Sequence, residues 1–311
     1  MIKKNKIRLG NYILVNYHYV RDPSDKFPGI NSCSVEEFEK QIKFLSENFK
    51  ILSIPEVFRA AKKKARGKFC AVTFDDCLKD VYVNAFPILK KYGVTSTIFL
   101  IASVLEKKLP SVHKLHILLS KFSAGELIEE FNRIFSGRYS ISKSIRIYKN
   151  KRLDDDIPTA NLKETLTVIP QNLKNNFIKS IFKNLKFNEA ETVENLFMNI
   201  KEIKGLCNSG FILGNHSYSH NNLSDLSVIE IRMDIKKAKK IIADFFGKNK
   251  KIDVFSYPSG RWSKNVMDAL QDEKIEYGLT IEERSVSSKD SPFLIPRYDA
   301  NNIRDYLNSI K

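Results

Sequence analysis

Residues 70–78 read CAVTFDDCL, an apolar run that passes directly into two adjacent carboxylates, Asp75 and Asp76. A continuous apolar run rich in β-formers indicates a strand that is buried on both faces. Neighbouring carboxylates repel each other, so a folded protein keeps such a pair where a cation or a proton transfer uses it, or where both carboxylates face water. The stretch therefore predicts a buried strand whose end carries either a functional or a solvated acidic pair.

Strand and helix signals alternate on both sides of this stretch. Further strands are predicted at 12–20, 50–54, 95–101, 211–217, 253–258, 277–281 and 293–298, and helices at 34–49, 55–65, 82–93, 227–247 and 264–274. S-x-x-E capping boxes at Ser34 and Ser227 mark the start of two of these helices. Apolar strands separated by amphipathic helices are typical of a parallel sheet covered on both faces, so we predict an α/β barrel.

The alternation stops in the middle of the chain. Helices are predicted at 113–135 and 173–187, and the polar stretch 143–166 between them is interpreted as a loop or lid. The predicted organisation is a discontinuous barrel, residues 1–105 and 197–311, with a helical insertion at 106–196. The insertion is a candidate for shaping an acceptor groove, docking on a membrane or mediating dimerisation, and the sequence leaves these alternatives and the oligomeric state open.

The chain is basic. Its 52 Lys and Arg residues exceed its 36 Asp and Glu residues by 52 − 36 = 16 among 311 residues. Such an excess favours anionic partners, although a composition bias spread over solvated faces gives the same number. We find no compact basic block with interleaved aromatic residues, which disfavours specific nucleic-acid binding.

The N-terminal residues and the cysteines give information about the cellular compartment. The first twenty residues lack the long apolar run and the cleavage site of a signal peptide, and no stretch is long enough for a transmembrane helix. The four cysteines show no C-x-x-C spacing, which suits reduced thiols. We expect a cytoplasmic protein, with peripheral contact to an anionic membrane or to a lipid-linked glycan as an option.

Two histidines, His216 and His220, follow the strand predicted at 211–217. The carboxyl ends of parallel strands share one edge of a sheet, so both are expected near Asp75 and Asp76. The H-x-x-x-H spacing is expected to put both imidazoles on one side of a helical turn, where they can share one ion with an aspartate. Two histidines and one carboxylate leave open positions on a metal, and the other aspartate then suits a general base. Each pair taken alone also fits a surface, core or capping role.

His18 ends the first predicted strand and is expected at the same edge. One interpretation is a structural histidine that bonds a neighbouring carbonyl, and the other is a general acid that protonates a leaving group. His113 and His116 lie in the insertion and are assigned to packing or to the surface.

Together these motifs resemble the polysaccharide deacetylases of carbohydrate esterase family four. The resemblance rests on TFDD (73–76), NAFPILKKYGVTSTIFL (84–100), SGFILGNHSYSHNNLSDLS (209–227), FSYPSG (255–260), YGLTI (277–281) and LIPRY (294–298). YHYV (17–20), with the later 34–58, resembles more narrowly the poly-N-acetylglucosamine deacetylase branch, which has an N-terminal Tyr-His motif. The resemblance covers residues 11–105 and 197–299. It implies a distorted (β/α)7-type barrel and one divalent metal, commonly Zn²⁺, with Ni²⁺ or Co²⁺ tolerated.

The resemblance also implies roles for individual residues. The metal ligands it implies are Asp76, His216 and His220. Asp75 matches the catalytic base, His18 the acid of the Tyr-His motif, and the backbone N–H of Ser259 an oxyanion donor. The arginine that usually starts the FSYPSG motif is replaced by Ser256, so we predict that Arg297 orients the base instead. Tyr218, Tyr257 and Trp262 are candidates for stacking on sugar rings, or they simply close the barrel mouth.

Cys77 departs from the family, which usually has glycine after the second aspartate. If the backbone there needs a positive φ, a cysteine costs about 1 kcal/mol and can shift Asp76. The thiol is either a buried small side chain or an additional soft metal ligand.

The implied function is a metal-dependent hydrolase that removes N-acetyl groups from an amino sugar or from an N-acetylated surface polysaccharide or its precursor. The alternatives are an amidohydrolase of the same fold acting on a non-sugar amide or formyl group, and a catalytically inactive glycan-binding homologue. A basic nucleic-acid module is the weakest alternative.

Overall fold

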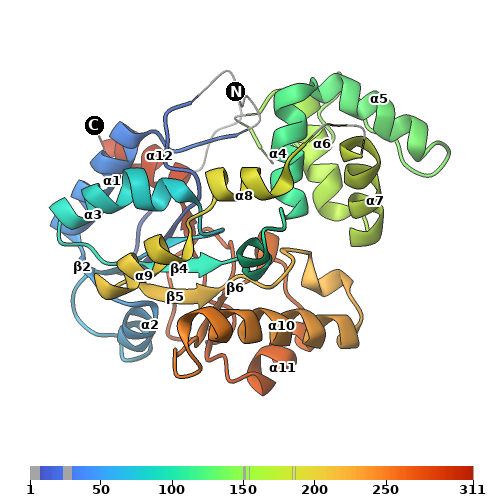
Figure 1. The fold of residues 1–311 in the computed structure, drawn as a ribbon. Helices are drawn as coiled ribbons and strands as arrows, with labels where there is room; N and C mark the ends of the chain where they lie inside the picture. Colours follow the sequence, from blue (N-terminus) through green and yellow to red (C-terminus); the bar gives the residue numbers. More distant parts are fainter. Residues whose placement is uncertain are drawn as a thin grey trace. The chain divides into compact units, whose positions relative to one another are not determined.

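The structure is a computed structural model that describes residues 8–23, 30–149, 152–153, 155–183, 185 and 187–310. The chain forms two compact units (Figure 1). Unit 1 consists of Met1–Asp22, Ser32–Lys108 and Ala190–Lys311, and unit 2 of Pro23–Asn31 and Leu109–Glu189. The larger segment of unit 2, Leu109–Glu189, thus lies within the predicted insertion, 106–196, and unit 2 also includes the earlier segment Pro23–Asn31.

Unit 1 is built on a parallel sheet. Its strands are β1 (Tyr12–Tyr17), β2 (Lys50–Ile51), β3 (Phe69–Phe74), β4 (Thr97–Leu100), β5 (Ile212–Asn215), β6 (Val254–Ser256), β7 (Tyr277–Leu279) and β8 (Tyr298–Asp299). Their order is β7-β6-β5-β4-β3-β1-β8, with β2 paired to β3, and the pairs are parallel. A bridge between Leu279 and Ile295 links the end of β7 to the segment before β8. The sheet therefore curls into a distorted barrel, which confirms the predicted fold class.

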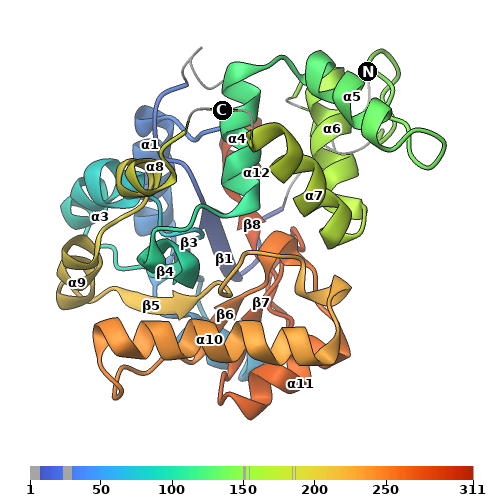
Figure 2. The same ribbon diagram turned by 45° about the vertical axis from the view of Figure 1, so that its right-hand side comes forward.

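Helices pack around this sheet. They are α1 (Val35–Asn48), α2 (Ile54–Lys62), α3 (Phe86–Lys91), α9 (Ile200–Asn208), α10 (Val228–Phe246), α11 (Lys264–Asp272) and α12 (Ala300–Ile310), while α8 (Glu189–Leu196) starts at the last residue of unit 2. Helices α10 and α11 lie side by side near β5 and β6 (Figure 2). Ser227 and Glu230 form the predicted capping box of α10, and Ser34 caps α1. Within the described residues, no helix has the length and apolar character needed to cross a bilayer.

The interior of the barrel has an apolar layer and a polar layer. Side chains two residues apart on an extended segment point to the same side. The apolar layer is the deeper one, and it includes Leu14, Ala71, Val254 and Ile295. These side chains form one buried cluster with residues of α2. Two residues further along the same four segments, the buried side chains are polar: Asn16, Thr73, Ser256 and Arg297. The polar layer is thus at the carboxyl edge of the sheet, where the site is predicted.

Gly214 in β5 shows how tightly this interior is packed. A Cβ atom added there would lie 2.5 Å from the ring of Phe99 and 2.9 Å from the side chain of Val254. The glycine therefore lets the neighbouring strands approach β5 closely, just before the histidine that follows the strand.

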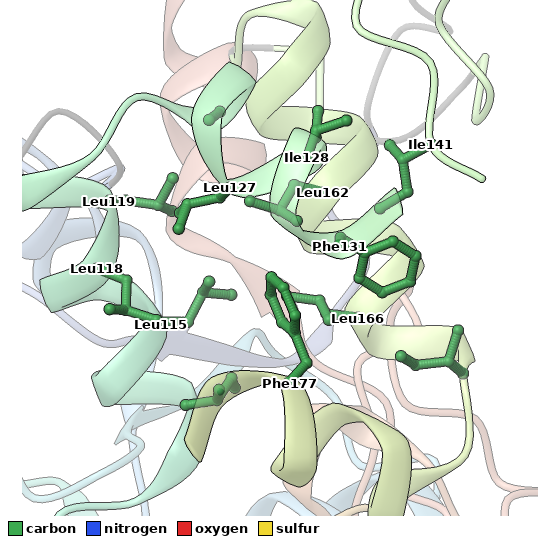
Figure 3. Close-up of a cluster of buried hydrophobic side chains, with 13 residues drawn as sticks. Leu115, Leu118, Leu119, Leu127, Ile128, Phe131, Ile141, Leu162, Leu166 and Phe177 are labelled. Carbon is green, nitrogen blue, oxygen red and sulfur yellow. The ribbon is translucent and has the colours of Figure 1, made fainter. Parts of the chain in front are cut away.

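Unit 2 is helical. Its helices are α4 (Ser111–Lys121), α5 (Ala124–Ile134), α6 (Ile157–Val168) and α7 (Gln171–Phe182). They surround a separate apolar cluster, in which the rings of Phe131 and Phe177 pack edge to face with centroids 5.2 Å apart (Figure 3). Part of the polar stretch 143–166, interpreted as a loop or lid, is in fact helical, because residues 157–166 belong to α6. Asp156 caps that helix by accepting from the Thr159 N–H, and Pro158 stands in its first turn.

Candidate active site

The predicted site residues follow neighbouring strands at one edge of the sheet. His18 comes after β1, Asp75 after β3 and His216 after β5. Tyr17 pairs with Phe74 at the ends of β1 and β3, so His18 and Asp75 leave the sheet at the same level. The parallel sheet thus brings these residues together, as the strand signals predicted.

Asp76, His216 and His220 form a group that can hold a cation. Their candidate ligand atoms all lie within 4.8 Å of one another. Asp76 Oδ1 is 3.4 Å from His216 Nε2 and 3.5 Å from His220 Nε2. Ligands about 2.1 Å from a tetrahedral ion would be about 3.4 Å apart, so both distances suit a bound cation.

The orientation of His216 supports the same fit. Its Nδ1 lies 2.7 Å from the carbonyl oxygen of Ser256. A ring nitrogen that donates to a carbonyl leaves the other nitrogen, here Nε2, with its lone pair toward Asp76. Burial alone would lower the pKa of His216, but the charge of Asp75, the hydrogen bond and charge of Asp76 and the bond to Ser256 raise it. A cation that binds Nε2 would therefore displace a proton from that nitrogen.

The two histidines are brought together by a loop, which corrects the prediction of a helical turn. Residues 216–220 have no helical assignment, and Ser217 and His220 have φ angles of 66° and 56°. The four-residue spacing therefore gives a common ligand group through a left-handed turn and not through helix periodicity.

Asp75 is buried in the polar layer and held by Arg297. The guanidinium donates two bonds of 2.9 Å, from Nη1 to Asp75 Oδ1 and from Nη2 to Asp75 Oδ2. Asn16 Nδ2 and Ser256 Oγ also donate to Asp75 Oδ2, at 3.0 and 3.1 Å. Burial would raise the pKa of Asp75, but Arg297 and the neighbouring histidines hold it well below its usual range. Asp75 is therefore ionised at neutral pH, and Arg297 takes the position predicted for it.

His18 faces the same carboxylate from the solvent side. Its Nε2 is 3.8 Å from Asp75 Oδ2, and its side chain is 41% exposed. The partly exposed imidazole therefore lies between the buried carboxylate of Asp75 and the solvent.

Cys77 has a φ angle of 62°, and Asp76 before it has a φ angle of 70°. The position thus has the left-handed backbone at which the family's glycine is free of strain. The Cys77 side chain is fully buried, and burial raises the pKa of its thiol well above the usual value. The candidate cation group does not include Cys77, so the structure supports the buried small side chain over the additional ligand.

The comparison with known proteins agrees with this geometry. The family model for polysaccharide deacetylases matches residues 62–130 and 155–278, which together are more than half of the chain. The chain belongs to the polysaccharide deacetylase family.

Two relatives within the family carry a more specific name. A poly-β-1,6-N-acetyl-D-glucosamine N-deacetylase of Staphylococcus epidermidis is 36% identical over 143 residues, which are 41% of this chain and 47% of that protein. The chain thus matches only about half the length of that relative. A Staphylococcus aureus protein of the same name is 25% identical over 95% of this chain and 80% of its own length.

Solved structures show that the deacetylase fold extends over the chain. The deacetylase PplD of Streptococcus pyogenes superposes with a TM-score of 0.60 at 17% identity, over 99% of this chain and 100% of that one. IcaB of Ammonifex degensii gives a TM-score of 0.59 at 17% identity, over 96% and 97% of the two chains.

Of the residues predicted to stack on sugar rings, Tyr257 is buried. Its side chain is 1% exposed and donates to the carbonyl of Phe293, so its ring is part of the protein core. This corrects the stacking hypothesis for Tyr257, because a buried ring offers no face to a sugar. Trp262 is 42% exposed. Ser259 follows β6 with a φ angle of 55°, in a short 3-10 turn.

Tyr218 is engaged in a polar cluster. Lys237 Nζ lies 3.7 Å from the centroid of its ring, and its hydroxyl donates to Glu106 and accepts from Lys108. One ring face is therefore covered by an ammonium group, which leaves less of Tyr218 for stacking on a sugar than predicted.

Two contributors to the candidate site were missed in the sequence. Asn16 donates to Asp75 and accepts from Arg297, and it interrupts the apolar run of β1 at an inward position. That polar residue two positions after Leu14 was the available signal. Asp234, in the middle of α10, binds the backbone of the loop between the histidines. An aspartate on an amphipathic helix gives no comparable signal.

Proposed function

We propose that the chain is a metal-dependent N-deacetylase that acts on N-acetylglucosamine units of a glycan. One observation carries the proposal. A three-ligand cation group lies beside an ionised aspartate, which is held by Arg297 on its buried side and faced by His18 on its solvent side. The names of the Staphylococcus relatives suggest the β-1,6-linked polymer as substrate.

Each residue then has a defined task in amide hydrolysis. A cation held by Asp76, His216 and His220 would polarise the acetyl carbonyl and acidify water. Asp75, ionised and fixed by two bonds from Arg297, accepts a proton from the attacking water. His18, 3.8 Å from Asp75 and partly exposed, donates a proton to the departing amine nitrogen. The Ser259 N–H is our candidate for stabilising the developing oxyanion. The products are acetate and a free sugar amine.

We assign Zn²⁺ as the ion, because two imidazoles and one carboxylate with open positions are typical of catalytic zinc. Ni²⁺ and Co²⁺ bind the same donor types, and the choice among them depends on metal supply as well as on affinity. Elemental analysis of the purified protein decides which ion it carries.

The remaining partner is a membrane surface or a lipid-linked glycan, in a cytoplasmic setting. The support for this part of the proposal is the net charge of +16, which favours contact with anionic lipid headgroups. The assignment of the catalytic residues does not depend on it.

The test is acetate release from N-acetylated β-1,6-linked glucosamine oligosaccharides, with and without a chelator. Asp75→Asn should lower kcat by about 10²- to 10⁴-fold and keep the metal, since it removes a base and not a ligand. His216→Ala should lose the metal as well as the activity.

Three results would change the proposal. Full turnover by Asp75→Asn would show that Asp75 is not the base. Release from non-sugar amides only would favour the amidohydrolase alternative. A metal-loaded wild type that releases no acetate from any amide would favour an inactive glycan-binding homologue.

A further inference from the structure

The loop between the two histidine ligands has an unfavourable backbone. Ser217 and His220 both have positive φ angles, 66° and 56°, and neither is glycine. Left-handed conformations of such residues persist only where the surrounding structure fixes them. Since His220 is itself one of the left-handed residues, whatever holds this loop also sets the direction of a ligand.

Side chains accept from five consecutive N–H groups of this loop. Asp234 accepts two of these bonds, from the N–H of Tyr218 to Oδ1 at 2.7 Å and from the N–H of Ser219 to Oδ2 at 3.1 Å. The other three acceptors are nearer in the chain: the N–H of Ser217 donates to Asn215 Oδ1 at 2.9 Å, that of His220 to Ser217 Oγ at 2.9 Å and that of Asn221 to Ser219 Oγ at 3.2 Å. Asn215, Ser217 and Ser219 belong to the loop or to the strand before it. Asp234 is different, because it reaches the loop from helix α10.

Asp234 is well placed to fix the loop to the rest of the barrel. Its side chain is buried, and it accepts a third bond of 2.5 Å from Ser219 Oγ. It lies between Ile231 and Ile235, whose buried side chains pack α10 into the apolar cluster on the outside of the sheet. The segment after β4 also binds the loop, because the N–H groups of Ala102 and Ser103 donate to the carbonyls of Ser217 and Tyr218 at 3.0 Å each. Two parts of the barrel thus bind the loop backbone, and Asp234 accepts the backbone bonds that reach α10.

We propose that Asp234 is a positioning residue for the cation group, and that it holds His220 in the orientation that faces Asp76. This inference rests on the cation site of the proposed function. Asp234→Asn replaces one of the two acceptor oxygens by an NH₂ group, which can only donate. The N–H of Tyr218 or of Ser219 then faces a donor and loses its hydrogen-bond partner. The loop can then relax from its left-handed turn, and the His220 ring moves out of reach of the shared ion.

The experiment measures metal affinity on the full-length protein after removal of metal. Asp234→Asn should bind Zn²⁺ about 10- to 100-fold more weakly than wild type in competition with a colorimetric chelator, the usual effect of losing a group that orients a ligand. The visible absorption of bound Co²⁺ should also change, because that spectrum reports the arrangement of the ligands.

Matched variants separate positioning from general destabilisation. Asp234→Glu keeps two acceptor oxygens and should restore part of the affinity. Asp244→Asn changes an exposed aspartate on the same helix, which pairs with Lys240, and should leave affinity unchanged. Should Asp234→Asn fail to fold, Ser219→Ala removes two of the loop bonds with a smaller change and should weaken binding several-fold.

The outcomes distinguish this inference from the proposed function. Wild-type affinity and spectrum in a folded Asp234→Asn, or in Ser219→Ala if that replaces it, would overturn the positioning role alone. A wild type that binds metal but releases no acetate would refute the deacetylase and leave the role of Asp234 decided by the affinities. A wild type that binds no divalent ion would refute both.

Discussion

The pair formed by Asp75 and Arg297 allows a quantitative test of the site that does not require substrate. We consider Arg297→Met, which removes the guanidinium and keeps an unbranched side chain in the buried polar layer. The exposed fractions of the two side chains are 1% for Arg297 and 4% for Asp75, so neither solvent nor salt screens their interaction. Removing one partner leaves a charged group buried without its counterion.

The size of the effect follows from the two bonds of 2.9 Å that join the pair. Hydrogen bonds to charged groups contribute about 1.5–3 kcal/mol each, and breaking a buried ion pair by removing one member costs about 3–5 kcal/mol. We expect Arg297→Met to lower the free energy of unfolding by about 3–5 kcal/mol at pH 7. A loss of 3 kcal/mol corresponds to roughly 6–12 °C in Tm for a unit of this size.

The assay is urea unfolding of metal-free protein, followed by circular dichroism, in a cycle with Asp75→Asn and the double variant. The double variant removes both charges, so we expect a coupling free energy of about 3 kcal/mol between the two positions. Metal is left out because its binding would add stability of its own to some of the variants.

The pH dependence of this difference has a definite sign. In the wild type, Arg297 holds the pKa of Asp75 below its usual range, so the carboxylate contributes stability above pH 4. Without Arg297, burial raises the pKa of Asp75. Above about pH 4 the folded variant then holds a proton that the unfolded chain has released, so the variant loses stability as the pH rises. The difference in unfolding free energy between wild type and Arg297→Met should therefore shrink as the pH falls from 7 toward 4. A coupling below about 1 kcal/mol, or a difference independent of pH, would refute the assignment of Arg297 as the partner of Asp75.

Two further predictions concern backbone strain and the helical unit. Cys77→Gly and Cys77→Ala both remove the buried sulfur, but only glycine adopts the φ angle of 62° without strain. Cys77→Gly should therefore be about 1 kcal/mol more stable than Cys77→Ala in chemical unfolding. Equal stabilities of the two variants would contradict backbone strain at this position. Lys163, buried in unit 2, contacts both oxygens of Asp155 at 3.1 and 3.0 Å. Lys163→Met should lower the free energy of unfolding by about 3–5 kcal/mol, whereas the exposed Lys179→Met should change it by less than about 0.5 kcal/mol; similar effects of the two would show that the buried ion pair is unimportant.

The limits of sequence interpretation are clearest at the histidine loop. The spacing of His216 and His220 predicted that they meet, and they do, but the predicted helical turn was wrong. The turn depends on left-handed residues and on a carboxylate from α10, and neither follows from a four-residue spacing. The missed start of α6 is a different case, since Asp156 and Pro158 are helix-start signals present in the sequence.

By itself, the sequence determined the parallel barrel and the edge at which the acidic pair and the histidines meet. Strand periodicity is local, and parallel strands necessarily end together, so residues that follow strands share that edge. Only the tertiary structure decided the contacts between distant segments. Arg297, 222 residues from Asp75, reaches that carboxylate because the curled sheet brings the segment before β8 next to β1. Tyr257, directly after β6, is buried and bonds to the carbonyl of Phe293. Such contacts depend on how the sheet curls and on how helices pack against it, and no short-range pattern encodes these distances.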